Sequence, residues 1–219
     1  CVCREGRGGG GEPQMLVGIF SARDATAKRE AVRLTWEIPP GVTAKFVLCA
    51  PGPSGAPADT PPGSLMRELV QENETYDDLM FLSCEEGYAH GLLTKKVVAF
   101  FTAVHERFGQ TRLIYKVDDD TVADLRALAD QLRAPDRFIY AGSFNHWVKK
   151  PTHDPKSRFY EPPEVFNETY YPFAALGGTG YVLSWPLVDY ILRSGVAARN
   201  LLWNEDRAVG VWVDLASKA

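Results

Sequence analysis

The chain has 219 residues, of which 45% are hydrophobic and 24% are charged, and its formal net charge is -4. This composition is typical of one globular domain with a substantial core, and it leaves too little chain for two large domains. A nucleic-acid-binding protein is excluded, because the lysines and arginines are dispersed and do not outnumber the acids. No apolar run approaches the roughly 18 to 20 residues that a membrane span requires.

The amino-terminal segment is expected to be a flexible lead-in. Residues 1–13 include four consecutive glycines and carry too little apolar surface to offset the entropy lost on ordering. The domain is therefore expected to occupy residues 14–219. Because the chain begins at Cys1 and not at a methionine, we expect a fragment or a processed form.

Strands and helices alternate through the first half of the chain. We predict strands at 15–20, 44–49 and 78–82, and helices that end at Trp36, at about Asn73 and at Phe108. This alternation is typical of an α/β fold with a mostly parallel sheet. Ser21 and Asp24 are candidate caps for the first helix. The stretch 51–63, rich in proline and glycine, is expected to be a surface loop.

Two basic residues on the first predicted helix are candidate ligands for an anion, and a third basic residue lies on a later helix. Arg29 and Arg33 are four residues apart and share a helix face, where they could reach a phosphate or a carboxylate. A solvated basic face is at least as compatible with that spacing. Lys96 lies at the margin of the apolar stripe of its helix, where a lysine usually extends its charge to the surface.

The most informative stretch is an apolar run that ends in three consecutive acids. Residues 113–117 predict a buried central strand, and Asp118, Asp119 and Asp120 follow it directly. Two carboxylates about 4 Å apart repel each other by roughly 1 kcal/mol in water and about 4 kcal/mol at an effective dielectric constant near 20, so the triplet favours a bound cation. Since ligands bind beyond the carboxyl ends of strands in open α/β sheets, Asp118 and Asp120 predict a Mg²⁺ or Mn²⁺ site that also binds a diphosphate.

A purely structural explanation of the triplet also exists. Thr121 or Asp120 could cap a following helix at 122–128, because the start of a helix gains from nearby negative charge. A cap needs one acid, however, and the chain supplies three.

The second half of the chain begins with a strand predicted at 137–142. An irregular segment follows to about Phe173, and it is rich in aromatic residues, Trp147 among them. We interpret it as a lid that faces an acceptor; a loop fastened to the core by its aromatic residues is the alternative. Glycines at the start of 176–184 permit a close approach of backbone to ligand before the next strand.

Two more helices complete the second half. One is predicted at 187–192, and Asn204 opens the other. The acids in its first turn are explained as well by the helix dipole as by chemistry.

Two cysteines and two asparagines bear on the cellular compartment. Cys49 and Cys84 each lie at the end of a predicted strand, where they could be neighbouring buried thiols or a disulfide. Asn73 and Asn167 begin Asn-Glu-Thr triplets and are glycosylation acceptors if the protein enters the secretory pathway.

Four blocks of residues occur in order along the chain. They are the arginine-rich helix that ends in Thr35 and Trp36, Lys116 with the acid triplet, the Gly-x-Gly-Tyr-Val-Leu-Ser run at 178–184, and Glu205-Asp206 with Gly210 and Trp212. Together they resemble the beta-1,3-galactosyltransferase family of inverting, nucleotide-sugar-dependent Golgi enzymes with the GT-A fold. The last block is most similar to the branch that acts on the glycosaminoglycan linker.

This resemblance implies a GT-A-like, Rossmann-like single domain that moves a hexose, with galactose as the first choice, from a UDP-sugar to a hydroxyl of a glycan or glycoprotein acceptor. It implies a beta-1,3 linkage, Mn²⁺ as the cofactor with Mg²⁺ as the alternative, a Golgi lumenal location, and a membrane anchor outside this chain. The family continues beyond its Glu-Asp block, so the domain is expected to be truncated at its carboxyl end.

The resemblance also implies roles for individual residues. Asp206 is expected to be the general base, with Glu205 as the second candidate. Asp120 and Asp118 are expected to hold the metal. The residues expected to bind the donor nucleotide are Arg29, Arg33, Lys96, Asp118 and Asp119. The residues expected to line an acceptor or sugar pocket are Trp147, Gly178, Gly180 and Tyr181.

Two rival functions remain at this point. The run from Val117 to Val122 also fits a haloacid-dehalogenase-like phosphohydrolase, in which Asp118 would be a phosphorylated nucleophile. That family places its motif on the first strand of the domain, whereas earlier strands precede the run here. A non-catalytic glycan-binding relative is the second rival.

Overall fold

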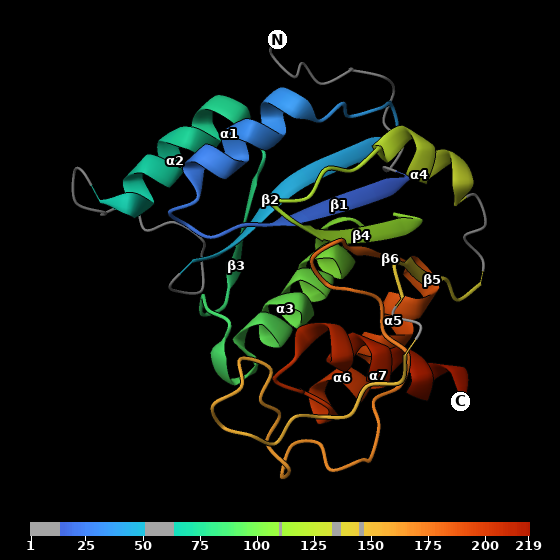
Figure 1. The fold of residues 1–219 in the computed structure, drawn as a ribbon. Coiled ribbons are helices and arrows are strands. Elements are labelled where there is room, and N and C mark those ends of the chain that lie inside the picture. Colours follow the sequence, from blue (N-terminus) through green and yellow to red (C-terminus); the bar gives the residue numbers. More distant parts are fainter. Residues whose placement is uncertain (1–13, 51–63, 110, 133–136, 145–146) are drawn as a thin grey trace.

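The computed structural model describes residues 14–50, 64–109, 111–132, 137–144 and 147–219. The expected lead-in at 1–13 and the expected surface loop at 51–63 lie outside the described residues. Within the described residues the chain forms one mixed sheet with helices on both faces (Figure 1). No helix in these ranges is long and apolar enough to cross a membrane.

The sheet has six strands in the order β3-β2-β1-β4-β6-β5. The strands are β1 (Met15–Phe20), β2 (Val42–Ala50), β3 (Leu79–Ser83), β4 (Leu113–Asp118), β5 (Tyr140–Gly142) and β6 (Tyr181–Ser184). The pairings β1/β2, β1/β4 and β2/β3 are parallel, whereas β6 is antiparallel to both β4 and β5. The prediction of a mostly parallel sheet is therefore confirmed.

Helices cover the sheet in two layers (Figure 1). One layer holds α1 (Thr26–Thr35), α2 (Leu65–Tyr76) and α4 (Leu125–Gln131). The other holds α3 (Leu92–Arg107), α5 (Trp185–Arg193), α6 (Val196–Arg199) and α7 (Glu205–Ser217), and a short 3-10 turn, Ala89–Gly91, precedes α3.

Strand β1 is buried on both faces, which explains why its sequence shows no polar alternation. Leu16 and Phe20 belong to the core on the α3 side, and the alternate residues Met15, Val17 and Ile19 belong to the core on the α1 side. A Cβ atom at Gly18 would lie 2.3 Å from the ring of Phe100, so the glycine makes room for α3. The two cores together hold the central strands in place.

The cap candidates for α1 were wrong, and so was the alternative that Thr121 or Asp120 caps the helix after the acid triplet. Helix α1 has Ala25 at its N-cap without a side-chain cap, while the Ser21 hydroxyl instead accepts from Arg29. Helix α4 starts only at Leu125, and Asp124 caps it by accepting from the Ala127 backbone N–H. The capping explanation of the acid triplet is therefore removed.

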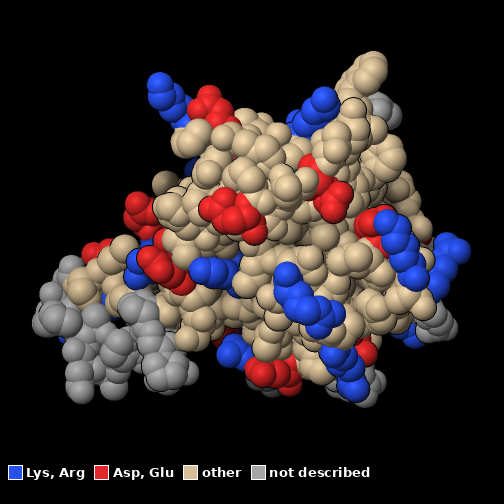
Figure 2. All heavy atoms as spheres, turned by 90° about the horizontal axis from the view of Figure 1, so that it is seen from below, with Lys and Arg blue, Asp and Glu red and all other residues tan. Residues whose placement is uncertain are grey.

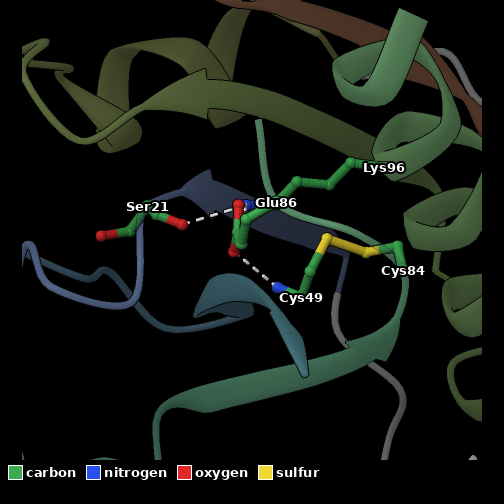
Figure 3. Close-up of a disulfide and its surroundings, with 5 residues drawn as sticks. All are labelled: Ser21, Cys49, Cys84, Glu86 and Lys96. Atoms are coloured by element: carbon green, nitrogen blue, oxygen red, sulfur yellow. Dashed lines mark hydrogen bonds and ion pairs between the residues drawn. A yellow bond between two sulfur atoms is a disulfide. The ribbon is translucent and has the colours of Figure 1, made fainter. Parts of the chain in front are cut away.

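Cys49 and Cys84 form a disulfide, which settles the alternative that the sequence left open (Figure 3). It ties the end of β2 to the segment after β3. Glu86 lies beside it, accepts from the Cys49 backbone N–H at 2.7 Å, and pairs with Lys96 at 3.0 Å. Lys96 also donates to the Ser21 carbonyl at 2.9 Å.

Lys96 is buried, so the expectation that it extends to the surface was wrong. Burial lowers the pKa of Lys96, and the Glu86 carboxylate only partly offsets that effect. The Lys96 ammonium group links the residue after β1, Ser21, to Glu86 in the segment after β3.

Candidate active site

The acid triplet lies at the carboxyl end of β4, next to the carboxyl end of β1. Asp118 is the last residue of β4 and pairs with Phe20, the last residue of β1. The Asp119 backbone N–H continues this pairing by donating to the Phe20 carbonyl at 3.2 Å. The loop after β1 and the acids after β4 consequently meet at one edge of the sheet, where ligands bind in folds of this kind.

Lys116 is buried at this edge of the sheet and contacts several parts of the site. Its Nζ donates to Asp118 Oδ1 at 2.8 Å and to the Gly177 carbonyl at 3.1 Å, and it lies 3.6 Å from Glu205 Oε2. Burial opposes the charge of this lysine, but the Glu205 and Asp118 carboxylates outweigh that effect and raise its pKa. One buried cation thus joins β4, the glycine turn and α7.

Lys28, on α1, neutralises the other two acids. Its Nζ lies 3.1 Å from both Asp119 Oδ1 and Asp120 Oδ2. Hydrogen bonds to Asp119 and Asp120 raise the pKa of Lys28. Sequence reasoning assigned no role to Lys28, and its only signal was its position one residue before Arg29.

Asp118 and Asp120 offer carboxylate oxygens, the ligand type that a divalent cation shared with a diphosphate would need. Among the residues that the structure describes, no group of three or more His, Cys, Asp or Glu side chains could hold a metal ion. Asp118 and Asp120 have side chains that are 33% and 65% exposed, which leaves their oxygens accessible. Mg²⁺ and Mn²⁺ are commonly held by one or two carboxylates, with waters and substrate phosphates completing the shell.

A turn of small residues, 177–180, packs over these acids. Gly180 has a φ of +86°, and a Cβ atom there would lie 2.6 Å from the Lys116 carbonyl. A Cβ at Gly177 would lie 2.5 Å from Glu205 Oε2 and 3.4 Å from Asp206 Cβ. This glycine-rich backbone approaches other parts of the chain closely, and a close approach to a ligand stays a prediction.

Gly178, which follows the first of these glycines, lies beside the triplet and the residue after it. A Cβ at Gly178 would lie 3.6 Å from Asp118 Oδ2. The Thr121 hydroxyl donates to the Gly178 carbonyl at 2.8 Å. The turn therefore adjoins both Asp118, on β4, and Asp206, on α7.

Glu205 and Asp206 share the first turn of α7 but differ in environment. Glu205 is buried and accepts from the Tyr181 hydroxyl at 2.5 Å. Burial raises the pKa of Glu205, and the nearby Lys116 and Tyr181 offset this only in part. The Asp206 side chain is 25% exposed, so it is the carboxylate of the pair that can meet a substrate.

Tyr181 does not line a pocket. Its side chain is fully buried beneath the site, and burial holds the pKa of its hydroxyl well above the usual range. The prediction that Tyr181 contacts a sugar is corrected, because strand β6 turns this residue into the core, where it fixes Glu205.

Arg29 and Arg33 contact carboxylates, which was one of the two alternatives for them. Glu72 on α2 lies 2.7 Å from Arg29 Nη2 and 2.6 Å from Arg33 Nη2, and Asp78 lies 2.8 Å from Arg33 Nε. Arg29 is fully buried, and all three of its guanidinium nitrogens donate hydrogen bonds within the protein. These contacts leave Arg29 no free donor for a nucleotide.

Trp147 borders a pocket of about 110 Å³ at the start of α7. The ring of Trp147 is 81% exposed. The pocket is lined by Trp147, Val148, Lys149, Tyr171, Pro172, Phe173, Ala174 and Arg207. Phe166 stacks on buried Tyr171, as expected for a loop fastened to the core by its aromatic residues, and Trp147 and Phe173 are exposed. The interpretation of the segment as a lid that faces an acceptor stays a prediction.

The two candidate glycosylation sites differ. Asn73 lies within α2 and its Oδ1 accepts from the Leu79 backbone N–H at 2.9 Å. Asn167 is exposed in an irregular loop. Of the two, Asn167 offers a more accessible amide.

Comparison with known proteins decides the family. The profile of the galactosyltransferase family matches residues 27–217, which include the acid triplet, the glycine turn and the start of α7. The chain belongs to the galactosyltransferase family. Its six-stranded α/β architecture is GT-A-like, and membership of this family removes the phosphohydrolase alternative.

Members of this family with curated names are similar over most of the chain. Beta-1,3-galactosyltransferase 6 of Mus musculus is 33% identical over 91% of this chain and 59% of its own length. A hydroxyproline O-galactosyltransferase of Arabidopsis thaliana is 29% identical over 93% of this chain and 29% of its own length. UDP-GlcNAc:betaGal beta-1,3-N-acetylglucosaminyltransferase 8 of Mus musculus is 30% identical over 83% of this chain and 45% of its own length. The chain thus spans less than two thirds of these relatives, and its assignment to the linker branch stays a prediction.

Proposed function

We propose that this protein transfers galactose from UDP-galactose to a hydroxyl group of a glycan or glycoprotein acceptor. The observation that carries the proposal is the glycine turn, which adjoins Asp118 on one side and Asp206 on the other. That contact brings the acids suited to a cation and diphosphate beside an accessible carboxylate suited to proton transfer. Family membership and the names of the relatives support galactose as the sugar.

Asp118 and Asp120 would hold a Mn²⁺ ion, or Mg²⁺ as the alternative, and such an ion supplies Lewis-acid stabilisation of a departing diphosphate. Lys28 covers Asp119 and Asp120 in this structure, so binding of a cation requires Lys28 to release Asp120. Lys116 keeps its contact with Asp118 and fixes the direction of that carboxylate. Asp118 also faces the ribose or uracil side of the nucleotide in this proposal.

Asp206 acts as the general base. It accepts the proton of the acceptor hydroxyl while the oxygen attacks the anomeric carbon on the face opposite the diphosphate, so the configuration inverts. This displacement forms a beta linkage, and the names of the relatives support linkage at position 3. Glu205 is internal and positions the turn through Lys116 and Tyr181.

The disulfide and one glycosylation triplet bear on the cellular compartment. We place the protein in the Golgi lumen, with a membrane anchor outside this chain. The disulfide supports an oxidising compartment, because cytosolic thiols are kept reduced, and the exposed Asn167 triplet supports passage through the secretory pathway. Galactose remains the first choice of sugar, although one relative is named for N-acetylglucosamine.

The variant Asp206→Asn tests the assignment of the base. We expect transfer from UDP-galactose to a panel of aryl beta-glycosides to fall by about 10²-fold or more, as loss of a general base requires. Affinity for UDP with Mn²⁺ should stay at the wild-type value, because Asp206 is not among the proposed cation ligands. Asp214→Asn is the matched control, since Asp214 lies further along α7 and pairs only with Lys218 among the described residues. Wild-type transfer by Asp206→Asn would overturn this role.

A further inference from the structure

Arg207 follows the proposed base and is almost fully buried. Its side chain lies in the first turn of α7, and the residue is 7% exposed. Its one ion pair within the described part of the chain is with Asp206, at 3.7 Å from Nη2 to Oδ2, and no described group accepts a hydrogen bond from it. A guanidinium carries five N–H donors, and Arg207 lines a pocket where a ligand could accept hydrogen bonds from them.

The surroundings of Arg207 form a pocket with fixed walls. The Tyr171 backbone N–H donates to the Lys149 carbonyl at 2.8 Å, which joins the two segments that line the pocket. A Cβ at Gly210 would lie 2.7 Å from Ala174 Cβ, so the glycine lets α7 approach the second of these segments closely. The Arg207 guanidinium lies 5.7 Å from the centre of the Tyr171 ring, and both residues line the pocket.

The pocket combines a cation with exposed aromatic surface. Trp147 and Phe173 are exposed at its rim, and Lys149 adds a second positive charge to its lining. Figure 2 views the side of the molecule on which α6 and α7 lie in Figure 1, and acidic and basic side chains are mixed across it. An anion would therefore be recognised here by particular cations rather than by a broad positive surface.

We propose that Arg207 and this pocket bind an anionic group, a carboxylate or a sulfate, on the acceptor glycan. A planar guanidinium matches such groups through two parallel hydrogen bonds, which satisfies donors that the protein leaves free. The ring of the charged sugar would rest against Trp147. Because Arg207 adjoins Asp206, an acceptor held in this way presents a neighbouring hydroxyl to the base. This inference rests on the proposed function, since it assumes that the acceptor lies beside Asp206.

Paired sugars that differ only in charge test the inference. We would measure binding of methyl beta-glucuronide against methyl beta-glucoside, and of methyl beta-galactoside 6-sulfate against methyl beta-galactoside, by ligand-observed NMR titration. The wild type should bind at least one charged sugar about tenfold more tightly than its neutral partner, the gain expected from a charge-assisted hydrogen bond. The glucuronide and sulfate arms distinguish the two anions.

Variants assign the effect to Arg207. Arg207→Gln should remove the preference, whereas Arg207→Lys should keep part of it because the charge remains. Arg126→Gln is the matched control, since Arg126 is exposed on α4, on the opposite side of the sheet, and it should bind as the wild type does. Equal binding of charged and neutral sugars by the wild type would overturn the inference, as would a preference that survives Arg207→Gln.

Binding of UDP with Mn²⁺, measured on the same samples, separates this inference from the proposed function. Normal UDP binding without a preference for charged sugars overturns the inference alone. A preference that depends on Arg207 in a protein that binds no UDP overturns the acceptor role of the pocket together with the proposed function.

Discussion

Each acid of the triplet has a different neighbour, and this decides what each can do. Asp119 is buried beneath Lys28, and Asp118 is fixed by Lys116. Asp120 has the most exposed side chain of the three and contacts only Lys28 among the described residues. An exposed ion pair of this kind contributes roughly 0–1 kcal/mol, so an incoming divalent cation can replace Lys28 at little cost.

Two glycines of the same turn should respond differently to a methyl group. Gly180→Ala places a Cβ 2.6 Å from the Lys116 carbonyl at a φ of +86°, and we expect a loss of roughly 2–4 kcal/mol in the free energy of unfolding from overpacking and backbone strain. Gly178→Ala meets only Asp118 Oδ2, at 3.6 Å. It should leave stability nearly unchanged while weakening UDP binding in Mn²⁺, because the methyl group takes up space beside the Asp118 carboxylate where the nucleotide is proposed to bind.

Urea denaturation and a UDP titration of both variants check this pair, and each variant serves as the control of the other. Equal destabilisation by the two substitutions would contradict the geometry of the turn. A Gly178→Ala protein that binds UDP as the wild type does would contradict the placement of the nucleotide beside Asp118.

Sequence reasoning found the accessible carboxylates and named Lys116 beside them, but it missed Lys28. Asp118, Asp120 and Asp206 were predicted because each belongs to a recognisable block of residues. Lys28 contacts Asp119 across 91 positions of sequence, and no local pattern encodes such a contact. Tyr181 was misplaced for a related reason, since period-two alternation in a short strand does not reveal which face is buried.

At the scale of elements, α1 and α2 are joined by ion pairs whose side chains are largely buried. Glu72 on α2 accepts from Arg29 and Arg33 on successive turns of α1. Burial works against ionisation of Glu72, but the two arginines outweigh it and hold its pKa below the ordinary value of 4.5. These two helices cover the same face of the sheet (Figure 1).

A pH titration of stability tests this contact. Because the pKa of Glu72 is lower in the folded state than in the unfolded state, its contribution is present above about pH 4.5 and is lost as the pH falls through the lower folded value. Glu72→Gln should therefore lose roughly 3 kcal/mol at pH 7, the lower end for breaking a buried pair, and should show a shallower decline of stability in acid. Glu68→Gln, an exposed acid on the same helix, is the control.

Chemical denaturation at a series of pH values makes the measurement. An unchanged acid profile for Glu72→Gln would contradict the assigned role. The predicted helices themselves were largely confirmed, and Asn204 is the N-cap residue of α7 as predicted. The caps suggested for α1 and α4 were not found, because the loops before these two helices are held by tertiary contacts such as Thr121 to Gly178.

At the scale of the whole molecule, the site depends on how the sheet orders its strands. Strand β4 lies between β1 and β6, so the acids after β4 meet both the loop after β1 and the turn before β6. Strand β6 runs antiparallel, and its start therefore lies at the same edge as the end of β4. The alternation of elements predicted the α/β class and the parallel half of the sheet. It could not predict the reversed strand, because direction within a sheet depends on contacts between distant segments.

The central claim is that the end of β4 binds a metal and a nucleotide diphosphate together. Thermal unfolding of the protein with UDP alone, Mn²⁺ alone and both together tests it most directly, since a ligand that binds only the folded state raises its melting temperature. We predict a shift of about 5 °C or more only when both are present at roughly a hundredfold excess over Kd. Asp120→Asn should abolish that shift and Asp214→Asn should retain it. A shift with UDP that needs neither Mn²⁺ nor Asp120, or no shift under any condition, would contradict the account.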